Sequence, residues 1–366
     1  MTPYDKFYAT RSELAATLID REAEIDLTLT ALIAQEHVLL VGPPGTGKSM
    51  LSDALVGWMT GRKFAIQINR FTTSEETFGP VSLAGLKVDK YRRVTTAKLP
   101  EADIAFIDEI FKASSAILNS LLQILNERTF RNDDVVSKCP LKLCIAASNE
   151  WPGEGDNGKE LGAMFDRFLF RKLVRPIGTE RSLHRLMWTA NLVPSLSTTI
   201  TPAEIDIASA EAAALPWDST AQESLHAILR EAGKEGIRPG DRRMRKSVRA
   251  AQSYAWLNGA GAVEPDHLEV LSHVLWDDPT EQPGKLAEIV SSIANPAGHQ
   301  INSFLMEAEQ VLSGLDVSDL AKCSLACKKL ADIEKSLRGI TGPRAEKARD
   351  HVKSEVARLR RAVVEG

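Results

Sequence analysis

One eight-residue stretch combines three glycines with a terminal Lys-Ser pair, a spacing suited to binding phosphate. It follows a short apolar run at residues 37–41, and it reads Gly42-Pro43-Pro44-Gly45-Thr46-Gly47-Lys48-Ser49. Glycines let successive backbone N–H groups face phosphate oxygens at the positive end of the helix that follows. We expect Lys48 to reach the β- and γ-phosphates and the Ser49 hydroxyl to hold Mg²⁺. A chance glycine turn is the alternative, and the order of strand, loop and helix argues against it.

A second element pairs two acids with an apolar segment about sixty residues further along the chain. The segment Ile104–Ile107 is followed by Asp108 and Glu109. This arrangement predicts that Asp108 lies beside the metal and that Glu109 polarises an attacking water. Adjacent acids are also common in solvated loops, so the position after the glycine loop decides the interpretation. It favours hydrolysis of a nucleotide over transfer of its phosphoryl group to another substrate.

Three further side chains could act on the same phosphates. Asn149 ends the next apolar segment and could orient the water or the γ-phosphate, although asparagine is common where strands turn. Arg167 follows a glycine-rich loop at residues 152–158 and lies far along the chain, which suits an arginine supplied by a neighbouring subunit. An ordinary ion pair with Asp166 is the alternative. Arg242 begins a helix and could reach back onto the phosphates, and the adjacent Arg243 leaves that assignment open.

The elements that must position these residues alternate between strand and helix. Apolar runs predict strands at 37–41, 64–68, 104–107 and 141–147, and helical periodicity predicts helices at 5–36, 50–59 and 114–126. Such alternation is typical of a parallel sheet covered on both faces. Beyond residue 176 we expect only helices, at 179–190, 221–233 and 242–258 and from 264–265 onward. The chain should end in a helical hairpin that turns near residues 339–343.

The predicted fold class is therefore α/β, with three consecutive parts. These are a nucleotide-binding core at 1–176, an all-helical lid at 177–276 and a helical tail at 277–366. A length of 366 residues, 43% hydrophobic and 26% charged, suits a globular protein of several units. A net charge of −4 argues against general affinity for nucleic acid or membranes. The sequence shows no signal peptide and no apolar run that could span a bilayer, so we expect a cytoplasmic protein.

The cysteines and histidines do not indicate a metal site of their own. Cys323 and Cys327 would share one helix face, but no second pair of ligands lies near them in the sequence. We therefore interpret the four cysteines, which include Cys139 and Cys144, as small apolar side chains. The seven histidines are scattered without ligand spacing.

With these elements in this order, the chain resembles an AAA+ ATPase of the MoxR family, and within it the RavA branch. The likeness is nearly continuous from about residue 36 to 176 and weaker at 241–243 and 275–277. It is carried by the stretches Arg70–Pro80, Leu99–Asp103 and Leu118–Arg128.

The resemblance implies a role for each candidate residue. It assigns Lys48 and Ser49 to the Walker A motif, Asp108 and Glu109 to Walker B, and Asn149 to sensor 1. It makes Arg167 the arginine finger and Arg242 sensor 2, with Arg171 as a second basic candidate near the finger. It also implies ATP and Mg²⁺ as ligands, a hexameric ring and chaperone-like remodelling. The implied partners are a von Willebrand factor A domain protein and a protein client.

Two insertions and the tail extend this comparison. Residues 82–96 should form a hairpin turning at 88–90, and residues 130–138 a second one turning at 131–134. In the family such hairpins face the ring pore, and plain surface decoration is the alternative. RavA-type proteins usually carry a small β-rich domain after the lid, whereas only helices are predicted here. A partner that docks on that domain therefore cannot be carried over.

Two other functions stay open at this point. A nucleic-acid-acting AAA+ factor would use the basic run Arg238, Arg242, Arg243, Arg245, Lys246 and Arg249. Helical spacing spreads these residues over several faces, so a solvated or subunit-facing helix is favoured and no nucleic acid is expected as a partner. A nucleotide-gated scaffold with little turnover is the other alternative.

Overall fold

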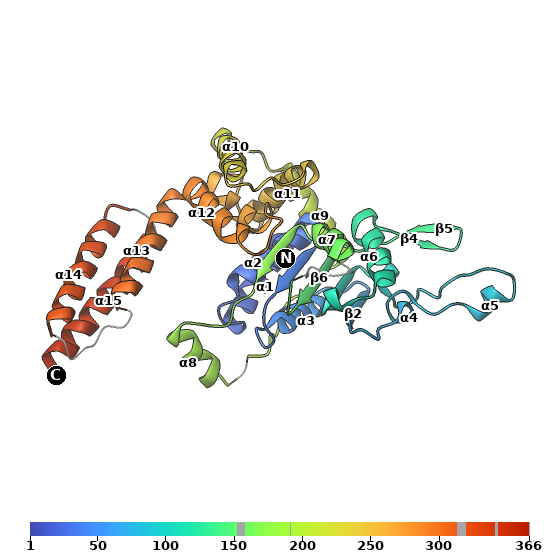
Figure 1. Cartoon of the computed structure of the whole chain (residues 1–366), viewed down its shortest axis with the longest axis horizontal. Helices are drawn as coiled ribbons and strands as arrows, with labels where there is room; N and C mark the ends of the chain where they lie inside the picture. Colours follow the sequence, from blue (N-terminus) through green and yellow to red (C-terminus); the bar gives the residue numbers. More distant parts are fainter. Residues whose placement is uncertain (152–157, 191, 313–319, 341–342, 366) are drawn as a thin grey trace.

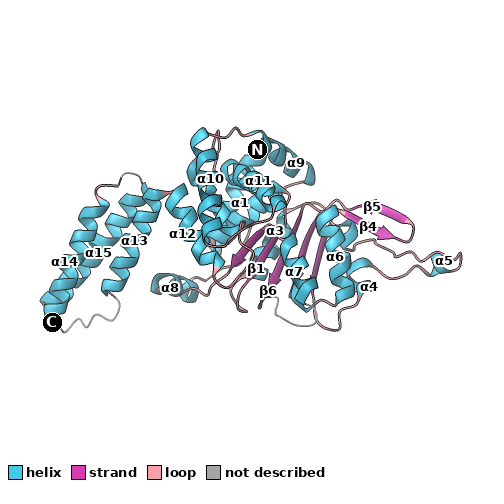
Figure 2. Cartoon of the chain, turned by 45° about the horizontal axis from the view of Figure 1, so that its top comes forward, coloured by secondary structure: helices cyan, strands magenta, loops and turns pink. Residues whose placement is uncertain are grey.

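The computed structural model describes residues 1–151, 158–190, 192–312, 320–340 and 343–365. At its centre is a parallel sheet of five strands in the order β2-β3-β6-β1-β7. These strands are Lys63–Gln67, Ile104–Asp108, Leu143–Ser148, Val38–Val41 and Phe170–Leu173. The three central strands are buried almost throughout, because helices cover both faces of the sheet (Figure 2).

The expected α/β core is confirmed, and one of its strands was missed. The edge strand β7 pairs with β1 in parallel, with Phe170 opposite Val38. Its sequence, Phe-Arg-Lys-Leu, carries two charges and lacks the apolar run that marked the other four strands. A central strand of a parallel sheet cannot take such residues, but this edge strand can, because Arg171 binds the Phe168 carbonyl oxygen and Asp277 and Lys172 contacts His273.

Helices on the two faces of the sheet hold the strands in place. The core contains α1 (Pro3–Thr17), α2 (Glu22–Ala34), α3 (Lys48–Trp58), α4 (Ser74–Phe78), α6 (Ser115–Glu127) and α7 (Gly158–Arg167). The single helix expected at 5–36 is in fact α1 and α2, separated by a turn in which Asp20 adopts a left-handed φ of 54°. Helix α2 is buried over nearly its whole circumference because α1, α9, α11 and β1 surround it.

The lid packs beside the sheet, and helices are its main elements among the described residues, with an isolated bridge between Trp217 and Val263. It contains α9 (Pro202–Ala214), α10 (Ser219–Lys234), α11 (Asp241–Leu257) and the 3-10 helix η3 (Pro265–His273). Helix α9 was not predicted, yet its start is marked in the sequence. Thr201 and Glu204 form a capping box around Pro202 at the first helical position.

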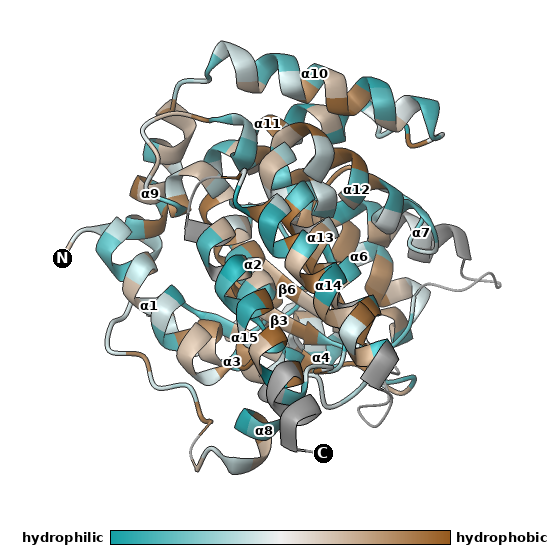
Figure 3. Ribbon diagram, turned by 90° about the vertical axis from the view of Figure 1, so that its left-hand side faces the viewer, coloured by the Kyte–Doolittle hydropathy of each residue, from teal (hydrophilic) through white to brown (hydrophobic). Residues whose placement is uncertain are grey.

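The C-terminal helices form a second, smaller core. Helix α12 (Gln282–Ala294) packs with the lid, whereas α13 (Pro296–Leu312), α14 (Leu320–Leu337) and α15 (Pro343–Glu365) share a separate apolar cluster. Figure 3 looks onto these helices from the tail side. The predicted hairpin is confirmed as α14 and α15, with Ile333, Leu337, Val352 and Leu359 buried between the helices. Leu325 of α14 is 57% exposed and lies outside this cluster.

One of the two expected hairpins forms. Strands β4 (Thr129–Asn132) and β5 (Val135–Lys138) are antiparallel and turn at Asp133. The other insertion has only one bridge among its described residues, Val81 to Arg93, and contains the short helix α5 (Leu83–Leu86). The Ser82 hydroxyl accepts a hydrogen bond from the Gly85 amide, and this cap turns the chain into a helical turn instead of a strand. Both insertions project from the same side of the molecule (Figure 1).

Candidate functional site

The glycine loop lies at the carboxyl edge of the sheet, between β1 and α3. Gly45 and Gly47 have left-handed φ angles of 77° and 83°, a conformation that glycine adopts without strain. Gly42 is restricted for a different reason, since an added Cβ would lie 2.1 Å from the carbonyl oxygen of Val174. Within the described chain, the backbone N–H groups of the loop from Gly45 to Lys48 donate to no protein acceptor. These amides lie at the start of an eleven-residue helix and fit the anionic oxygens of a phosphate.

Lys48 is buried inside this loop and contacts its own backbone. Its Nζ atom donates to the carbonyl oxygens of Gly42 at 2.6 Å and Pro43 at 2.9 Å, and to Asn149 Oδ1 at 3.2 Å. Burial lowers the pKa of Lys48, while the nearby carboxylates of Asp108 and Glu109 act in the opposite direction. The ammonium group is thus held at the base of the loop, where the phosphates of a nucleotide would lie. Ser49 is exposed in the first turn of α3.

The two acids of the motif lie in different environments. Asp108 ends β3, and burial raises its pKa, assisted by the charge of Glu109. Glu109 is buried and has a left-handed φ of 54°. Its carboxylate accepts a hydrogen bond from Asn149 Nδ2 and lies 3.3 Å from Lys112 Nζ. The structure therefore brings Lys48, Asp108, Glu109 and Asn149 together, as the order of motifs predicted.

A residue that the sequence did not reveal also holds the loop. Arg21, at the start of α2, is buried and donates from Nε to the carbonyl oxygen of Thr46 at 2.8 Å. Its other donors bind the carbonyl oxygens of Asp20 at 2.7 Å and Arg175 at 2.9 Å. Arg21 thus ties the glycine loop to the segment that follows β7. An arginine more than twenty residues before the loop carries no motif, so only the fold could identify it.

Arg167 and Arg242 lie at the opposite, amino edge of the sheet. Arg167 ends α7 just before β7, and Arg242 is exposed in the first turn of α11. Together with Asp166 and Lys246 they line a cavity of about 70 Å³. The amino end of α11 is fixed there by Lys246, which forms an ion pair of 2.5 Å with Glu36, just before β1.

This placement differs from the expectation that Arg242 reaches the phosphates of its own chain, which stays a prediction. Strand β1 separates the two edges, and four residues of strand span about 13 Å. The phosphate loop begins where β1 ends, whereas α11 begins beside the residues that precede β1. Arg242 therefore lies near the edge opposite the glycine loop of the same chain, as Arg167 does.

Arg243 and Arg171 serve the fold beneath that edge. Arg243 is buried and donates to the carbonyl oxygens of Val274 at 2.9 Å and Asp166 at 3.0 Å, and to Asp166 Oδ1 at 2.9 Å. Arg171 is fully buried over the Phe165 ring, 3.9 Å from its centroid, and burial lowers its pKa to about 9. Burial alone would raise the pKa of Asp166, but the hydrogen bond from Arg243 holds it below the ordinary value. Neither arginine is free to bind a nucleotide, which leaves Arg242 and Arg167 as the candidates.

The same network weakens the nucleic-acid interpretation. Of the basic run on α11, Arg243 is buried, Lys246 pairs with Glu36, and Arg249 donates to the Ser209 carbonyl and hydroxyl oxygens. These side chains bind the protein itself and do not form one open basic face. The glycine-rich loop at 152–157 lies outside the described residues.

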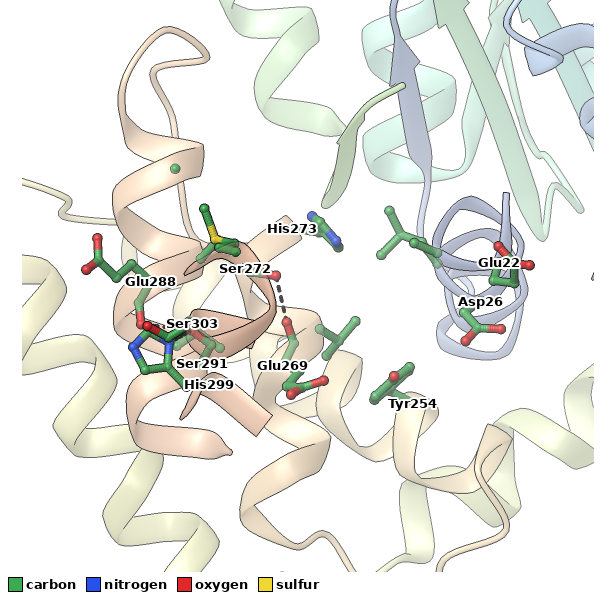
Figure 4. Close-up of a pocket in the computed structure, with 17 residues that line it drawn as sticks. Glu22, Asp26, Tyr254, Glu269, Ser272, His273, Glu288, Ser291, His299 and Ser303 are labelled. Carbon is green, nitrogen blue, oxygen red and sulfur yellow. Dashed lines mark hydrogen bonds between the residues drawn. The ribbon is translucent and has the colours of Figure 1, made fainter. Parts of the chain in front are cut away.

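A larger cleft of about 880 Å³ lies apart from the glycine loop, between α2, α11, η3, α12 and α13 (Figure 4). Two acidic side chains of its lining have partners within the described chain. Asp26 Oδ1 accepts from Arg11 Nε at 2.6 Å, and Glu269 Oε1 accepts from Asn295 Nδ2 at 2.9 Å. No cluster of potential metal ligands occurs among the described residues, and no described helix is long and apolar enough to cross a membrane.

The cysteines have the properties of apolar side chains, as predicted. Cys139, Cys144 and Cys323 are buried, and Cys327 is partly buried. Burial raises the pKa of Cys139 to about 11 and that of Cys144 to about 12, so both thiols stay protonated near neutral pH.

Comparison with known proteins agrees with this geometry. A family model described as the MoxR domain in the MoxR-vWA-beta-propeller ternary systems matches residues 5–210, and an AAA lid domain model matches residues 222–290. The chain belongs to the MoxR family of AAA+ ATPases. The lid match extends through most of α12, in agreement with the packing of that helix.

Individual relatives support the same family. Two uncharacterized proteins of Methanocaldococcus jannaschii are 38% and 36% identical to this MoxR protein, each over 88% of this chain and 84% of its own length. Among solved structures, the crystal structure of a proposed ATPase from Cytophaga hutchinsonii covers 75% of this chain and 86% of its own chain. Its TM-score is 0.59 and its identity 16%, a likeness that concerns the fold alone.

Proposed function

We propose that this MoxR protein hydrolyses ATP within an oligomeric ring and uses the energy to remodel or activate a partner protein. One observation carries the proposal. The phosphate-binding residues and the two candidate arginines, Arg167 and Arg242, lie at opposite edges of one sheet. A site that contains both groups requires the amino edge of one copy to meet the carboxyl edge of the next. Such a head-to-tail contact generates a ring when its rotation closes, and we propose the hexamer typical of the family.

Within one copy, the residues divide binding from turnover. The loop amides and Lys48 bind the phosphates, and Ser49 and Asp108 supply the oxygen ligands that Mg²⁺ prefers. The bound ion would neutralise charge on the phosphates. Glu109 then accepts a proton from the attacking water, and Asn149, which bonds both Glu109 and Lys48, keeps the carboxylate directed at the phosphate end.

Arg167 of one copy would stabilise charge on the phosphoryl group held by its neighbour. Its current partner is Asp166, at 2.9 Å, and its Nε atom is buried without a hydrogen bond in the described chain. The guanidinium is thus only partly satisfied in the isolated chain. Arg242 lines the same cavity and would approach the neighbour's nucleotide from the lid side.

Steady-state ATPase assays test this division directly. Glu109→Gln should bind nucleotide and lose turnover, and Arg167→Ala should do the same while its own glycine loop stays intact. Mixing the two inactive variants should restore part of the activity, because a wild-type Arg167 then meets a wild-type Glu109 at some interfaces. Normal turnover by Arg167→Ala would refute the shared site. Wild-type protein that binds ATP without turnover would favour the scaffold alternative.

The partner proposal rests on the family description and on the insertions. The matched family occurs in systems with a von Willebrand factor A domain protein and a β-propeller protein, and we propose the former as a partner here. The insertions expose Leu83, Val88 and Tyr91 at 77%, 63% and 58%, and hydrogen bonds between Arg93 and Asn132 tie the two together. We propose that they contact the client. Proteins that co-purify with Glu109→Gln under ATP, but not with the same variant carrying Tyr91→Ser, would identify it.

A further inference from the structure

Helix α8 (Glu180–Trp188) presents an apolar face that no other element covers among the described residues. It extends from the chain between β7 and α9, apart from the lid and from the tail (Figures 1 and 2). Leu183, Leu186 and Met187 lie one turn apart on one side of the helix and are 39%, 44% and 66% exposed, and Trp188 is 73% exposed. Apolar side chains gathered in this way on a surface indicate a contact with another molecule.

The start of α8 is tied to the phosphate loop. The Ser182 hydroxyl donates to Asp20 Oδ1 at 2.7 Å, and Asp20 precedes Arg21, which holds the Thr46 carbonyl oxygen. Ser182 and Arg21 are both buried. Helix α8 is therefore fixed at the carboxyl edge of the sheet, the edge that would receive Arg167 and Arg242 of a neighbouring copy.

The chain that follows α8 lines an apolar groove beside α3. It is a cleft of about 490 Å³ whose lining includes Met50, Ala54, Pro194 and Leu196. Met50 follows Ser49 of the glycine loop directly and is 44% exposed. Apolar side chains thus occur on α8, a few residues further along the chain at Pro194 and Leu196, and at the residue next to the proposed magnesium ligand.

We propose that this surface, formed by α8 and the adjoining groove, is a docking surface for a second copy of this chain. The inference rests on the proposed ring, because the ring places a neighbour's amino edge against this edge. A second copy is the expected occupant because of where the apolar face lies. The face begins beside the glycine loop, and the proposed ring brings the neighbour's arginines to that loop. The glycine loop is connected to α8 through Arg21 and Asp20. Because of this connection, nucleotide bound in the loop and contact of α8 with the neighbour would stabilise each other.

Two methionines of nearly equal exposure provide a matched test. Met187, on α8, is 66% exposed, and Met306, on α13, is 63% exposed. We expect Met187→Glu to weaken assembly with ATP at least about tenfold, since a charge would be buried at the contact. Met306→Glu should assemble like the wild type. Sedimentation velocity over a concentration series measures this, and unchanged melting temperatures would show that both variants are folded.

A photoreactive phenylalanine analogue in place of Trp188 identifies the occupant. Crosslinks between two copies that increase with ATP support the proposal, and crosslinks to α13, α14 or α15 of the same chain would overturn it. If the wild type assembles and Met187→Glu assembles equally well, the docking surface is wrong while the ring stands. If the wild type stays a monomer with and without ATP, the ring fails and this inference fails with it.

Discussion

The adjacent arginines Arg242 and Arg243 offer the sharpest test of the site, because the structure gives them opposite roles. Arg243 is buried, and its guanidinium donates to the carbonyl oxygens of Leu169, just before β7, and of Val274 in the lid. Arg242 is exposed beside Arg167. We compare Arg243→Met, which keeps an apolar stem, with Arg242→Met. The first should unfold more easily and the second should lose turnover.

The expected loss of stability for Arg243→Met follows from the bonds that it breaks. The carbonyl oxygens of Val274 and Asp166 lose donors in a buried setting, at about 1–3 kcal/mol each. The ion pair with Asp166 adds less than a buried pair would, since that carboxylate is half-exposed. A total of about 3 kcal/mol corresponds to a drop in melting temperature of roughly 4–5 °C for a chain of this length. Arg242→Met should change the free energy of unfolding by no more than about 0.5 kcal/mol.

Activity should show the reverse order. If Arg242 contributes to a neighbour's nucleotide site, Arg242→Met should lower ATPase turnover at saturating ATP by about tenfold or more. The assay is run at a protein concentration at which the wild type is assembled, and scanning calorimetry is run on the same samples. Full turnover by Arg242→Met would refute the cross-subunit role. An unchanged melting temperature for Arg243→Met would refute the structural role.

Three other predictions concern different parts of the chain. Arg21→Gln should weaken ATP binding by about tenfold, because it removes the charge-assisted bond to Thr46, whereas Arg11→Gln, whose partner is Asp26, should bind ATP normally in titration calorimetry. Burial holds the pKa of the His37 imidazole well below 6.5, so the folded protein binds fewer protons at this residue than the unfolded chain does. The stability linked to neutral His37 is therefore present above pH 6.5 and lost as the pH falls below it. The loss should approach about 1.4 kcal/mol per pH unit, and thermal melts at pH 7.5, 6.5 and 5.5 should show a weaker dependence for His37→Gln. Leu83→Ser in the exposed insertion should leave basal ATPase and melting temperature unchanged while reducing co-purification of the client.

The core of the fold was predictable because its signals are local. Each central strand is a short apolar run. Asp108 ends β3, Glu109 and Asn149 directly follow their strands, and the glycine loop leads from β1 to Lys48, so the parallel order brings the four residues to one edge. Strand β7 was missed because its two charged residues are satisfied by tertiary contacts that no local pattern records. The alternation of side chains in the first insertion predicts a hairpin, but the insertion contains a helical turn because the Ser82 hydroxyl caps it.

The roles of the arginines could not be predicted, because they depend on which edge each side chain occupies. Arg242 and Arg243 are the same residue type at adjacent positions, but they lie on different faces of α11. Arg243 is buried and Arg242 is exposed. Arg21 binds the carbonyl oxygen of Thr46, 25 residues further along the chain. Every residue has a backbone carbonyl, so this contact leaves no sequence pattern in the loop that would identify Arg21.

In the proposed ring, one copy of the chain would be an incomplete catalyst. The carboxyl edge holds the groups proposed to bind phosphate and activate water, and it carries the exposed face of α8. The amino edge holds a half-satisfied arginine and an exposed one above a rigid layer formed by Arg171, Arg243 and Asp166. A rigid support of this kind is needed to present Arg167 to another molecule with little loss of conformational entropy. If Arg167 served only to pair with Asp166, the two buried arginines would not be needed beneath it. The arrangement is accounted for if the ligand of the amino edge is the nucleotide of the next subunit.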